Sequence, residues 1–355
     1  MNSNAVCVFC DDAYFPVASI LCRQLAAEER RDFDVILFIE SRLETPPAAP
    51  TGAGFEVRAI QMDALIPAGS QWSSRISRAA YNRLFMGDLL EERYTKALYL
   101  DCDIAIWGPV SQLFTLDLGS APLAAVQDCN FVKQPTDSLR GQWAAYLHSV
   151  EIQQPERYFN SGVLLADLTA WRQRDIKGLM GAYIARHGAR MTGMDQDTLN
   201  FIFQGEWAEL SPRWNFQLLC SGFGLERELD ARIFHYVDNL KPWHDLVFNW
   251  GQHHIKDFDT RFRAASWPGF LVQARKREHY KRHAKWRVRN AMRWLPPVAK
   301  RFERENTRRR QYRDLTVDHV LRAIDENRYL DVRAGLTIVD RQKIENLRDN
   351  PIQGV

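Results

Sequence analysis

Short apolar runs alternate with longer amphipathic segments along the first hundred residues. Runs such as AVCVFC (5–10) are continuously apolar, which is typical of strands buried on both faces, whereas the segments between them place apolar residues at helical spacing. The strand-like runs cover residues 5–10, 32–40, 54–62 and 96–106, and the helical segments cover residues 17–31 and 77–92. Strands and helices that alternate at this interval predict βαβ units. We therefore expect the α/β class, with a single Rossmann-like domain built on a mostly parallel central sheet.

The order of elements is less regular after residue 120. Strands are predicted at residues 123–128, 162–168 and 231–237, and helices at residues 168–188, 195–205 and 315–327. Asp167 stands directly before the first of these helices, where its carboxylate can cap free N–H groups. The composition becomes basic near residues 260–275, which indicates a boundary. We expect the α/β domain to cover residues 1–270 and a basic, amphipathic helical extension to cover residues 271–355.

The formal net charge of +3 conceals an uneven distribution of charge. Between Arg275 and Arg313 there are 16 Lys or Arg and three Glu, whereas the rest of the chain carries 31 basic and 41 acidic residues. A mildly acidic body joined to a strongly basic segment indicates two parts with different partners.

Composition and cysteine usage argue against two classes of protein. No run of about 18 apolar residues, the length that spans a bilayer, occurs, and the N-terminal residues reach Asp11 and Asp12 without a signal-peptide core. The six cysteines are spread through the chain, unlike those of a secreted disulfide framework. We therefore expect reduced thiols and a cytoplasmic protein, rather than a membrane-spanning or small secreted one.

The clearest candidate for chemistry is Asp101-Cys102-Asp103, which follows the apolar residues 96–100. If the strand continues through the motif, both carboxylates lie on one face, at the edge where open α/β sheets collect ligands. Two close ionised carboxylates repel each other, and a divalent cation removes this repulsion while it leaves coordination positions for substrate phosphates. The pattern also occurs by chance, with one carboxylate as a cap and the other solvated, so both interpretations stay open.

Three further segments place polar residues in apolar surroundings. Asp195-Gln196-Asp197 opens a predicted helix, where an aspartate suits capping but Gln196 has no structural role. Asn160-Ser161-Gly162 interrupts an apolar stretch, for which a turn is the favoured interpretation and a ligand contact the alternative. His235 lies in an apolar strand, as a core histidine does, and Lys241 precedes a Pro-Trp pair on a stiffened loop, where it can meet an anion. Together these groups could bind a metal-chelated nucleotide diphosphate sugar.

Six motifs occur in order between about residue 5 and about residue 250. They are CDDAY (10–14), RAAYNR (78–83), LYLDCD (98–103), YFNSGVL (158–164), DQD (195–197), and HY (235–236) followed by KPW (241–243). In this order and at this spacing they resemble glycosyltransferase family 8, and within it the bacterial lipopolysaccharide galactosyl- and glucosyltransferases. The resemblance implies a GT-A-type fold and a retaining enzyme that moves galactose or glucose from a UDP-sugar to a saccharide acceptor, in the synthesis of lipopolysaccharide or another cell-surface glycan.

The resemblance also implies a role for each matching residue. Asp101, Asp103 and His235 would bind the metal, for which Mn²⁺ is favoured over Mg²⁺ because a nitrogen ligand suits the softer ion. The UDP-sugar would be contacted by Asp11 and Tyr14 at the uracil, by Lys241 at the diphosphate, by Arg83, Asn160, Asp195 and Gln196 around the sugar, by Cys102 and Ser161, and by the two aspartates of the metal site. Of these residues, Asn160, Asp195 and Gln196 are expected to be catalytic.

Charge develops in two places in such a reaction. A metal and Lys241 would stabilise the negative charge on the departing UDP, and Asp195 would stabilise the positive charge on the sugar ring or anchor a sugar hydroxyl. Gln196 stands at the position of a nucleophile, but an amide is a poor one. We therefore favour attack from the face that UDP leaves, with a phosphate oxygen accepting the proton of the acceptor, over a double displacement. Departures from the family pattern at Gly193, Met194 and Asp238 leave the acceptor open, and Ala13 departs from it at the uracil, where the family commonly has a polar Asn.

Two other functions fit part of the sequence. A nucleotidyltransferase also uses a Rossmann-like sheet and paired carboxylates, but it would cleave a nucleoside triphosphate and does not need the arrangement of His235 and Lys241. A non-catalytic nucleotide-sugar-binding module would keep the fold but would be expected to lose catalytic positions, and these are all present.

The basic segment at residues 275–313 has Trp residues beside an apolar stripe at helical spacing, and Pro296-Pro297 is expected to kink it. Such a segment is typical of a helix on an anionic membrane surface, where each Lys or Arg adds about 1 kcal/mol. We expect it to hold the protein on the inner face of the membrane, near a glycolipid acceptor. A solvated or packed helix is the second interpretation, and a nucleic-acid arm is the least favoured.

Overall fold

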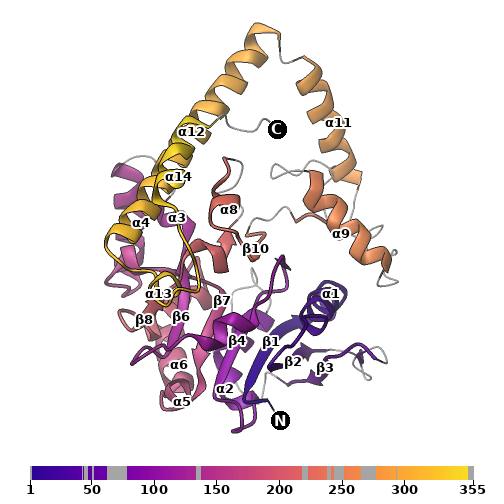
Figure 1. Cartoon of the computed structure of the whole chain (residues 1–355), viewed down its shortest axis with the longest axis vertical. Coiled ribbons are helices and arrows are strands. Elements are labelled where there is room, and N and C mark those ends of the chain that lie inside the picture. The colour runs from indigo at the N-terminus through magenta and orange to yellow at the C-terminus, as the bar shows by residue number, and fades with distance from the viewer. Residues whose placement is uncertain are drawn as a thin grey trace.

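The computed structural model describes residues 2–41, 43, 47–49, 52–61, 78–132, 137–217, 223–237, 241–243, 252–264, 277–292 and 294–350. Figure 1 shows a body built around strands and two long helices, α11 (Arg277–Ala291) and α12 (Pro296–Asp325), that meet at an angle far from the sheet. The expected α/β class and the helical character of the C-terminal region are confirmed. Within the described ranges, no helix is both long enough and apolar enough to cross a membrane.

The body contains a seven-stranded sheet in the order β3-β2-β1-β4-β7-β6-β8. Its strands are β1 (Asn4–Asp11), β2 (Phe33–Glu40), β3 (Glu56–Ala59), β4 (Lys96–Leu100), β6 (Leu123–Gln127), β7 (Phe159–Asp167) and β8 (Trp207–Glu209). All neighbours are parallel except β7, which runs antiparallel to β4 and β6, so the mostly parallel sheet is confirmed. The strand order reverses at β1, and a crevice at the carboxyl ends of β1 and β4 is the expected place for a ligand.

Residues 96–106 are not one strand, as the apolar pattern predicted, but two strands in different sheets. β4 ends at Leu100, and β5 (Ile104–Ile106) joins a three-stranded sheet with β10 (Ile233–His235) and β9 (Phe216–Gln217) in the order β5-β10-β9. Residues 101–103 form the turn between β4 and β5, so the two aspartates do not share the face of a strand. Adjacent carboxylates would be costly in a buried strand, which explains why the strand ends before them.

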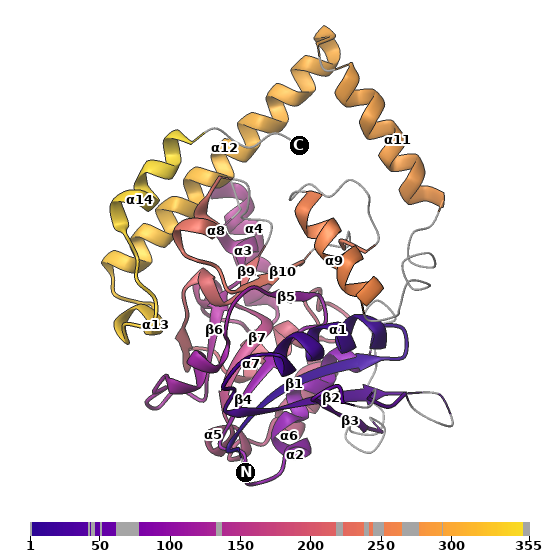
Figure 2. The same ribbon diagram turned by 45° about the vertical axis from the view of Figure 1, so that its right-hand side comes forward.

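Helices pack on both faces of the large sheet, as the two views in Figures 1 and 2 show. The α-helices of the body are α1 (Phe15–Ala26), α2 (Met86–Leu89), α3 (Cys129–Val132), α4 (Asp137–Ser149), α5 (Leu168–Arg172), α6 (Ile176–His187), α7 (Asp195–Ile202), α8 (Leu225–Glu228) and α9 (Gln252–Ala264). Short 3₁₀ helices are η2 (Arg78–Phe85), η3 (Ser111–Thr115), η4 (Pro155–Arg157), η5 (Pro212–Trp214) and η7 (Leu347–Asp349).

Three predicted helices differ from the observed ones. The helix predicted at residues 17–31 ends at Ala26, because the charged residues that follow have no apolar face and Arg30 adopts a φ of 57°. The segment at residues 77–92 is mostly the 3₁₀ helix η2. The helix predicted at residues 168–188 is two helices, α5 and α6. Asp167 caps the first as expected, and Asp175 caps the second by accepting from Gly178 N–H at 2.9 Å.

The turn expected at Asn160-Ser161-Gly162 is wrong, because these residues lie inside β7. Asn160 pairs with Val126 of β6 and Leu164 pairs with Ala125, so the three residues between Asn160 and Leu164 form a bulge. Bulges of this kind redirect side chains and are common beside functional sites. Asn160 and Ser161 therefore remain in the sheet, while the bulge changes the direction of their side chains.

Alternate residues of β1 contribute to apolar cores on opposite faces of the sheet. Cys7 and Phe9 pack in the core that contains α6 and α7, whereas Val6 and Val8 pack in the core that contains α1. A strand whose residues are buried on both faces explains the continuous apolar run at residues 5–10.

A third apolar core joins the C-terminal residues to the body. Val317, Val320 and Leu321 of α12 pack with Phe216 of β9, and they are followed by α13 (Leu330–Arg333) and α14 (Arg341–Asn346). The helix predicted at residues 315–327 is thus the buried second half of α12. The division of the chain at residue 270 stays a prediction, but the residues after Arg313 pack on the body.

The angle between α11 and α12 lies at the two prolines. Pro296 and Pro297 occupy the first positions of α12, where a missing N–H costs nothing, so they begin a helix and do not kink one as expected. The first half of α12 leaves the body, and its end nearest to α11 is the part of the described chain farthest from the sheet (Figure 2).

Asp331 attaches the C-terminal segment to the loop before β9. Its fully buried carboxylate accepts from Ser211 N–H at 2.7 Å, from the Ser211 hydroxyl at 2.6 Å and from Trp214 Nε1–H at 3.1 Å. We expect Asp331→Ala to lower the free energy of unfolding by about 3 kcal/mol, because it leaves three buried donors without an acceptor. Urea denaturation measures this change. The exposed Asp349→Ala should change it by less than about 0.5 kcal/mol, and a similar small change for Asp331→Ala would contradict the assignment.

Candidate active site

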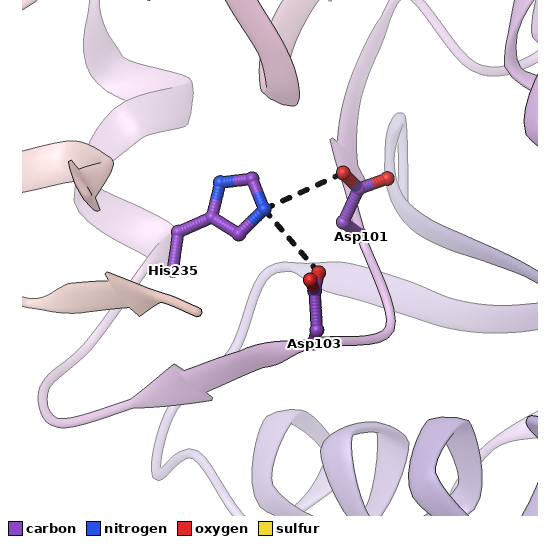
Figure 3. A group of neighbouring side chains, drawn as sticks. All are labelled: Asp101, Asp103 and His235. Atoms are coloured by element: carbon purple, nitrogen blue, oxygen red, sulfur yellow. Dashed lines mark ion pairs between the residues drawn. The ribbon is translucent and has the colours of Figure 1, made fainter. Parts of the chain in front are cut away.

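The turn between β4 and β5 places two aspartates beside the last residue of β10 (Figure 3). Nε2 of His235 lies 3.3 Å from Oδ1 of Asp103 and 3.6 Å from Oδ2 of Asp101. One potential ligand atom from each residue lies within 4.8 Å of those of the other two. The imidazole is buried and the two carboxylates are partly exposed, so the group has an open side. Its members are the three residues for which the resemblance implied metal binding.

Backbone hydrogen bonds hold this turn from both sides. The N–H of Asp101 donates to the carbonyl of Gly162 at 2.8 Å, and the N–H of Tyr236 donates to the carbonyl of Asp103 at 3.0 Å. Gly162 is required for this close approach, because a Cβ there would lie 2.2 Å from Cε1 of His235 and 2.8 Å from Oδ2 of Asp101. The absent side chain thus provides the space in which the imidazole and the carboxylates face one another.

Lys241 neutralises one of the two aspartates. Its ammonium donates to Oδ2 of Asp103 at 2.6 Å and to the carbonyl of Tyr236 at 2.5 Å. Burial by itself would raise the pKa of Asp103, but Lys241 and then His235 outweigh it and hold this pKa well below its usual range. Asp103 is therefore ionised and ready to accept a cation.

Arg83 connects the other aspartate to the start of α7. Its buried guanidinium lies 2.9 Å from Oδ1 of Asp101 and 3.1 Å from Oδ2 of Asp195, and it donates to the carbonyl of Ser161 at 2.9 Å. Burial raises the pKa of Asp195 to about 6, although Arg83 opposes the shift. Each aspartate of the turn therefore has its own basic partner.

A network of buried amides lies beside the cluster. Nε2 of Gln196 and Nδ2 of Asn160 each donate to Oδ2 of Asp128 at 3.0 Å. Oε1 of Gln196 accepts from the N–H of Ser161, also at 3.0 Å. Asp128 thus orients both amides that were expected to be catalytic. Asp128 was not recognised from the sequence because it ends residues 123–128 in the way that any strand runs into a loop.

The aspartates at the start of α7 do not cap it. The cap position is Met194, whose φ of 48° is unusual for a residue with a side chain, and no side chain there accepts a cap hydrogen bond. Asp197 accepts from the hydroxyls of Tyr146 and Tyr158 at 2.5 and 2.7 Å and from the N–H of Gly193 at 2.8 Å. The capping interpretation is therefore wrong. Asp197 holds the preceding loop, and Asp195 faces Arg83.

The residues expected at the uracil lie at and just after the carboxyl end of β1. Oδ1 of Asp11 accepts from the N–H of Tyr14 at 3.0 Å. The Tyr14 ring is 36% exposed and meets Trp243 edge-on, with ring centroids 6.4 Å apart, so it offers a surface for a base. Cys102 differs, because its Sγ donates to the carbonyl of Phe9 at 3.0 Å and its side chain therefore faces β1.

Residues 56–247 match the family described as Glycosyl transferase family 8. The chain is 35% identical over 181 residues to a probable glycosyl transferase Gly of Streptococcus gordonii, covering 50% of this chain and 24% of that protein. It is 24% identical over 216 residues to the lipopolysaccharide 1,3-galactosyltransferase of Salmonella typhimurium, covering 57% of each. The chain thus spans less than two thirds of the length of these two relatives.

Solved structures show the same fold. The galactosyltransferase LgtC, in complex with donor and acceptor sugar analogs, is similar to this chain with a TM-score of 0.58 and 26% identity, over 72% of this chain and 95% of that one. Fold and site define an α/β protein of GT-A type, with a carboxylate-imidazole cluster at the carboxyl edge of its sheet. The chain belongs to glycosyl transferase family 8.

Proposed function

We propose that this protein transfers a hexose, galactose or glucose, from a UDP-sugar to a saccharide acceptor in a metal-dependent reaction that retains the anomeric configuration. The observation that carries the proposal is the cluster of Asp101, Asp103 and His235, with Arg83 and Lys241 beside it. The donor and acceptor sugar analogs bound to the similar LgtC support a sugar donor and a sugar acceptor.

The cluster fits a divalent cation. Two carboxylates and one imidazole converge, and the missing side chain of Gly162 leaves room between them. A mixed oxygen and nitrogen donor set favours Mn²⁺, with Mg²⁺ as the alternative. When bound, the ion supplies Lewis-acid stabilisation of negative charge on the departing diphosphate.

The basic residues have separate tasks in this proposal. Lys241 is held at the cluster by Asp103, where it can exchange this carboxylate for a phosphate oxygen of the donor. Arg83 stays with Asp101 and Asp195 and keeps both carboxylates oriented. Asp195 is thereby placed to bind a sugar hydroxyl or to stabilise positive charge on the ring.

Attack from the face that UDP leaves accounts best for Gln196. A nucleophilic role would require its Oε1 to leave the N–H of Ser161, and an amide oxygen is a weak nucleophile. Its fixed amide is better suited to contact the sugar. The amide of Asn160, which donates to the same carboxylate of Asp128, is placed for the same task. LgtC has been solved as an active-site glutamine-to-glutamate mutant, which supports a glutamine in the active site.

Relatives suggest the biological setting. The similar lipopolysaccharide galactosyl- and glucosyltransferases of Salmonella typhimurium and Escherichia coli support a role in the synthesis of a cell-surface glycan. We propose that the acceptor is a saccharide or glycolipid and that the reaction takes place at the cytoplasmic face of the membrane.

The proposal is tested by release of UDP. The protein is incubated with UDP-galactose or UDP-glucose and Mn²⁺, with and without a saccharide acceptor, and UDP and the anomeric configuration of the product are measured. We expect release of UDP that EDTA abolishes and excess Mn²⁺ restores, and an α-linked product from these α-linked donors. Release of pyrophosphate from UTP instead would identify a nucleotidyltransferase, and donor binding without turnover would identify a non-catalytic module.

The basic helices are proposed to attach the protein to an anionic membrane. Exposed apolar side chains lie near the end of α11 and just before α12, with Val288 58% and Trp294 75% exposed, among exposed basic residues such as Lys285 and Arg287. Basic residues around exposed Trp and Val are typical of membrane-surface helices. The projection of this region away from the sheet (Figure 1) would leave the cluster accessible.

We expect Lys285→Glu/Arg287→Glu to weaken binding to anionic vesicles about thirtyfold or more, because two basic residues contribute about 2 kcal/mol. Co-sedimentation with vesicles that contain phosphatidylglycerol measures the effect. The matched control is Lys177→Glu/Arg190→Glu, which changes the same charge on exposed residues in and after α6. Equal binding by both variants would contradict this membrane surface. Substitutions are preferred to truncation because residues after Arg313 belong to the third core.

A further inference from the structure

A chain of side-chain hydrogen bonds runs behind the cluster from Asp128 to His235. Asn160 Nδ2 donates to Asp128 at 3.0 Å, Asn215 Nδ2 donates to Asn160 Oδ1 at 2.8 Å, and Asn215 Oδ1 lies 3.0 Å from Nδ1 of His235. All four residues are more than nine-tenths buried, and Asn215 is fully buried. The chain thus ends on the ring nitrogen opposite to the one that faces the two carboxylates.

The direction of this chain is set by two groups that cannot reverse. The N–H of Gly162 can only donate, and it lies 3.1 Å from Oδ1 of Asn160. The second group is Oδ2 of Asp128, which accepts from Nδ2 of Asn160. The amide of Asn160 therefore has one allowed orientation, with its oxygen toward Gly162 and Asn215.

The orientation of Asn160 also determines that of Asn215. Because Oδ1 of Asn160 is an acceptor, Asn215 must present its NH₂ group to it, and its own oxygen then faces His235. Nδ1 of His235 must therefore carry a hydrogen. In the neutral imidazole, which is the form that binds a metal, this leaves the lone pair on Nε2, the atom 3.3 Å from Asp103 and 3.6 Å from Asp101.

We propose that Asn215 is the positioning residue that fixes the tautomer of His235 and so makes its Nε2 a metal ligand. Through Asn160 it also ties the geometry of the imidazole to the amides on the sugar side. The inference rests on the proposed function in one respect only, that the ligand of His235 is a divalent cation. Partners behind a ligating histidine commonly determine metal affinity in this way.

The C-terminal segment holds Asn215 in place. Asn215 directly follows η5. Ser211, which precedes this helix, and Trp214, which ends it, both donate to the buried carboxylate of Asp331. Residues at the end of the chain thereby support the loop behind the candidate metal site. Residues after Arg313, for which the sequence predicted no function, thus have a structural role.

Two substitutions that keep the branched shape of the side chain separate tautomer control from other effects at position 215. Asn215→Leu removes the acceptor for Nδ1, so we expect Mn²⁺ to bind 10- to 100-fold more weakly. Asn215→Asp keeps an oxygen at Nδ1, so Mn²⁺ affinity should stay within about threefold of the unsubstituted protein. The measurement is a titration with Mn²⁺ alone, without nucleotide, followed by the EPR signal of free Mn²⁺.

The outcomes are distinct. Unchanged affinity of Asn215→Leu, or equal loss in both variants, would overturn the role of Asn215 while leaving the metal site intact. Failure of the unsubstituted protein to bind Mn²⁺ would overturn the metal site and this role with it. If Asn215→Leu does not fold, spectra of the unsubstituted protein with ¹⁵N-labelled histidine rings and Mg²⁺ decide: Nδ1 of His235 must be protonated and Nε2 not, and the reverse pattern would overturn the proposal.

Discussion

Asp103→Asn is expected to lower kcat for hexosyl transfer at least about a thousandfold, which corresponds to about 4 kcal/mol of transition-state stabilisation. The amide has the shape of the carboxylate but not its charge. It therefore removes one oxygen anion from the cluster with His235 and also the ionic partner of Lys241. Both groups are proposed to act where charge develops on the diphosphate, so their loss affects the transition state more than the bound donor.

Rates at saturating Mn²⁺ and donor, together with Mn²⁺ binding, measure this effect. The matched control is Asp117→Asn, which removes the same charge from an exposed loop residue after η3 and should leave kcat within about twofold. A variant Asp103→Asn that is folded, by circular dichroism, and retains more than about a tenth of the activity would show that this carboxylate is not in the reacting site.

Gly162→Ala is expected to weaken Mn²⁺ binding more than about a hundredfold, although it adds a single methyl group far from solvent. The new Cβ would lie 2.2 Å from Cε1 of His235 and 2.8 Å from Oδ2 of Asp101. His235 cannot easily retreat, because it is buried and hydrogen-bonded to Asn215, so the methyl group must separate the imidazole from the carboxylates.

Gly141→Ala provides the control for the same substitution. Gly141 lies in α4, and a Cβ there would meet no atom within 4 Å. This control should bind Mn²⁺ normally and be more stable by about 0.5–1 kcal/mol, as expected for alanine in a helix. Normal Mn²⁺ binding by Gly162→Ala would contradict the close approach of β7 to the cluster.

The local apolar pattern was enough to predict six strands of the large sheet, and it missed only the three-residue strand β8. Each of its long strands is buried on both faces, so residues 5–10 and 32–40 are continuously apolar and could be recognised without knowledge of their neighbours. The second sheet was missed because its strands are two or three residues long, and because β5 pairs with β10 across more than a hundred positions of sequence, as Ile104 and His235 show. The turn at Asp101–Asp103 was missed for the same reason, because the strand with which β5 pairs lies far along the sequence.

The candidate site was predictable to the extent that it consists of motifs. Asp101, Asp103 and His235 were named from the sequence and lie together, and Arg83 and Lys241 lie beside them. Asp128 and Asn215 were not named, because each acts only by orienting another side chain and has no pattern of its own. The need for glycine at position 162 likewise depends on an imidazole 73 positions later in the sequence.

The central claim is that one cation, bound by Asp101, Asp103 and His235, holds the diphosphate of the donor. Pulsed EPR of the protein with Mn²⁺ and UDP tests it most directly, because magnetic coupling identifies the nuclei next to the ion. The account predicts coupling to one histidine nitrogen and to phosphorus, and loss of the nitrogen coupling in His235→Ala. The claim would be contradicted if bound Mn²⁺ showed no nitrogen coupling, or if the nitrogen coupling persisted in His235→Ala.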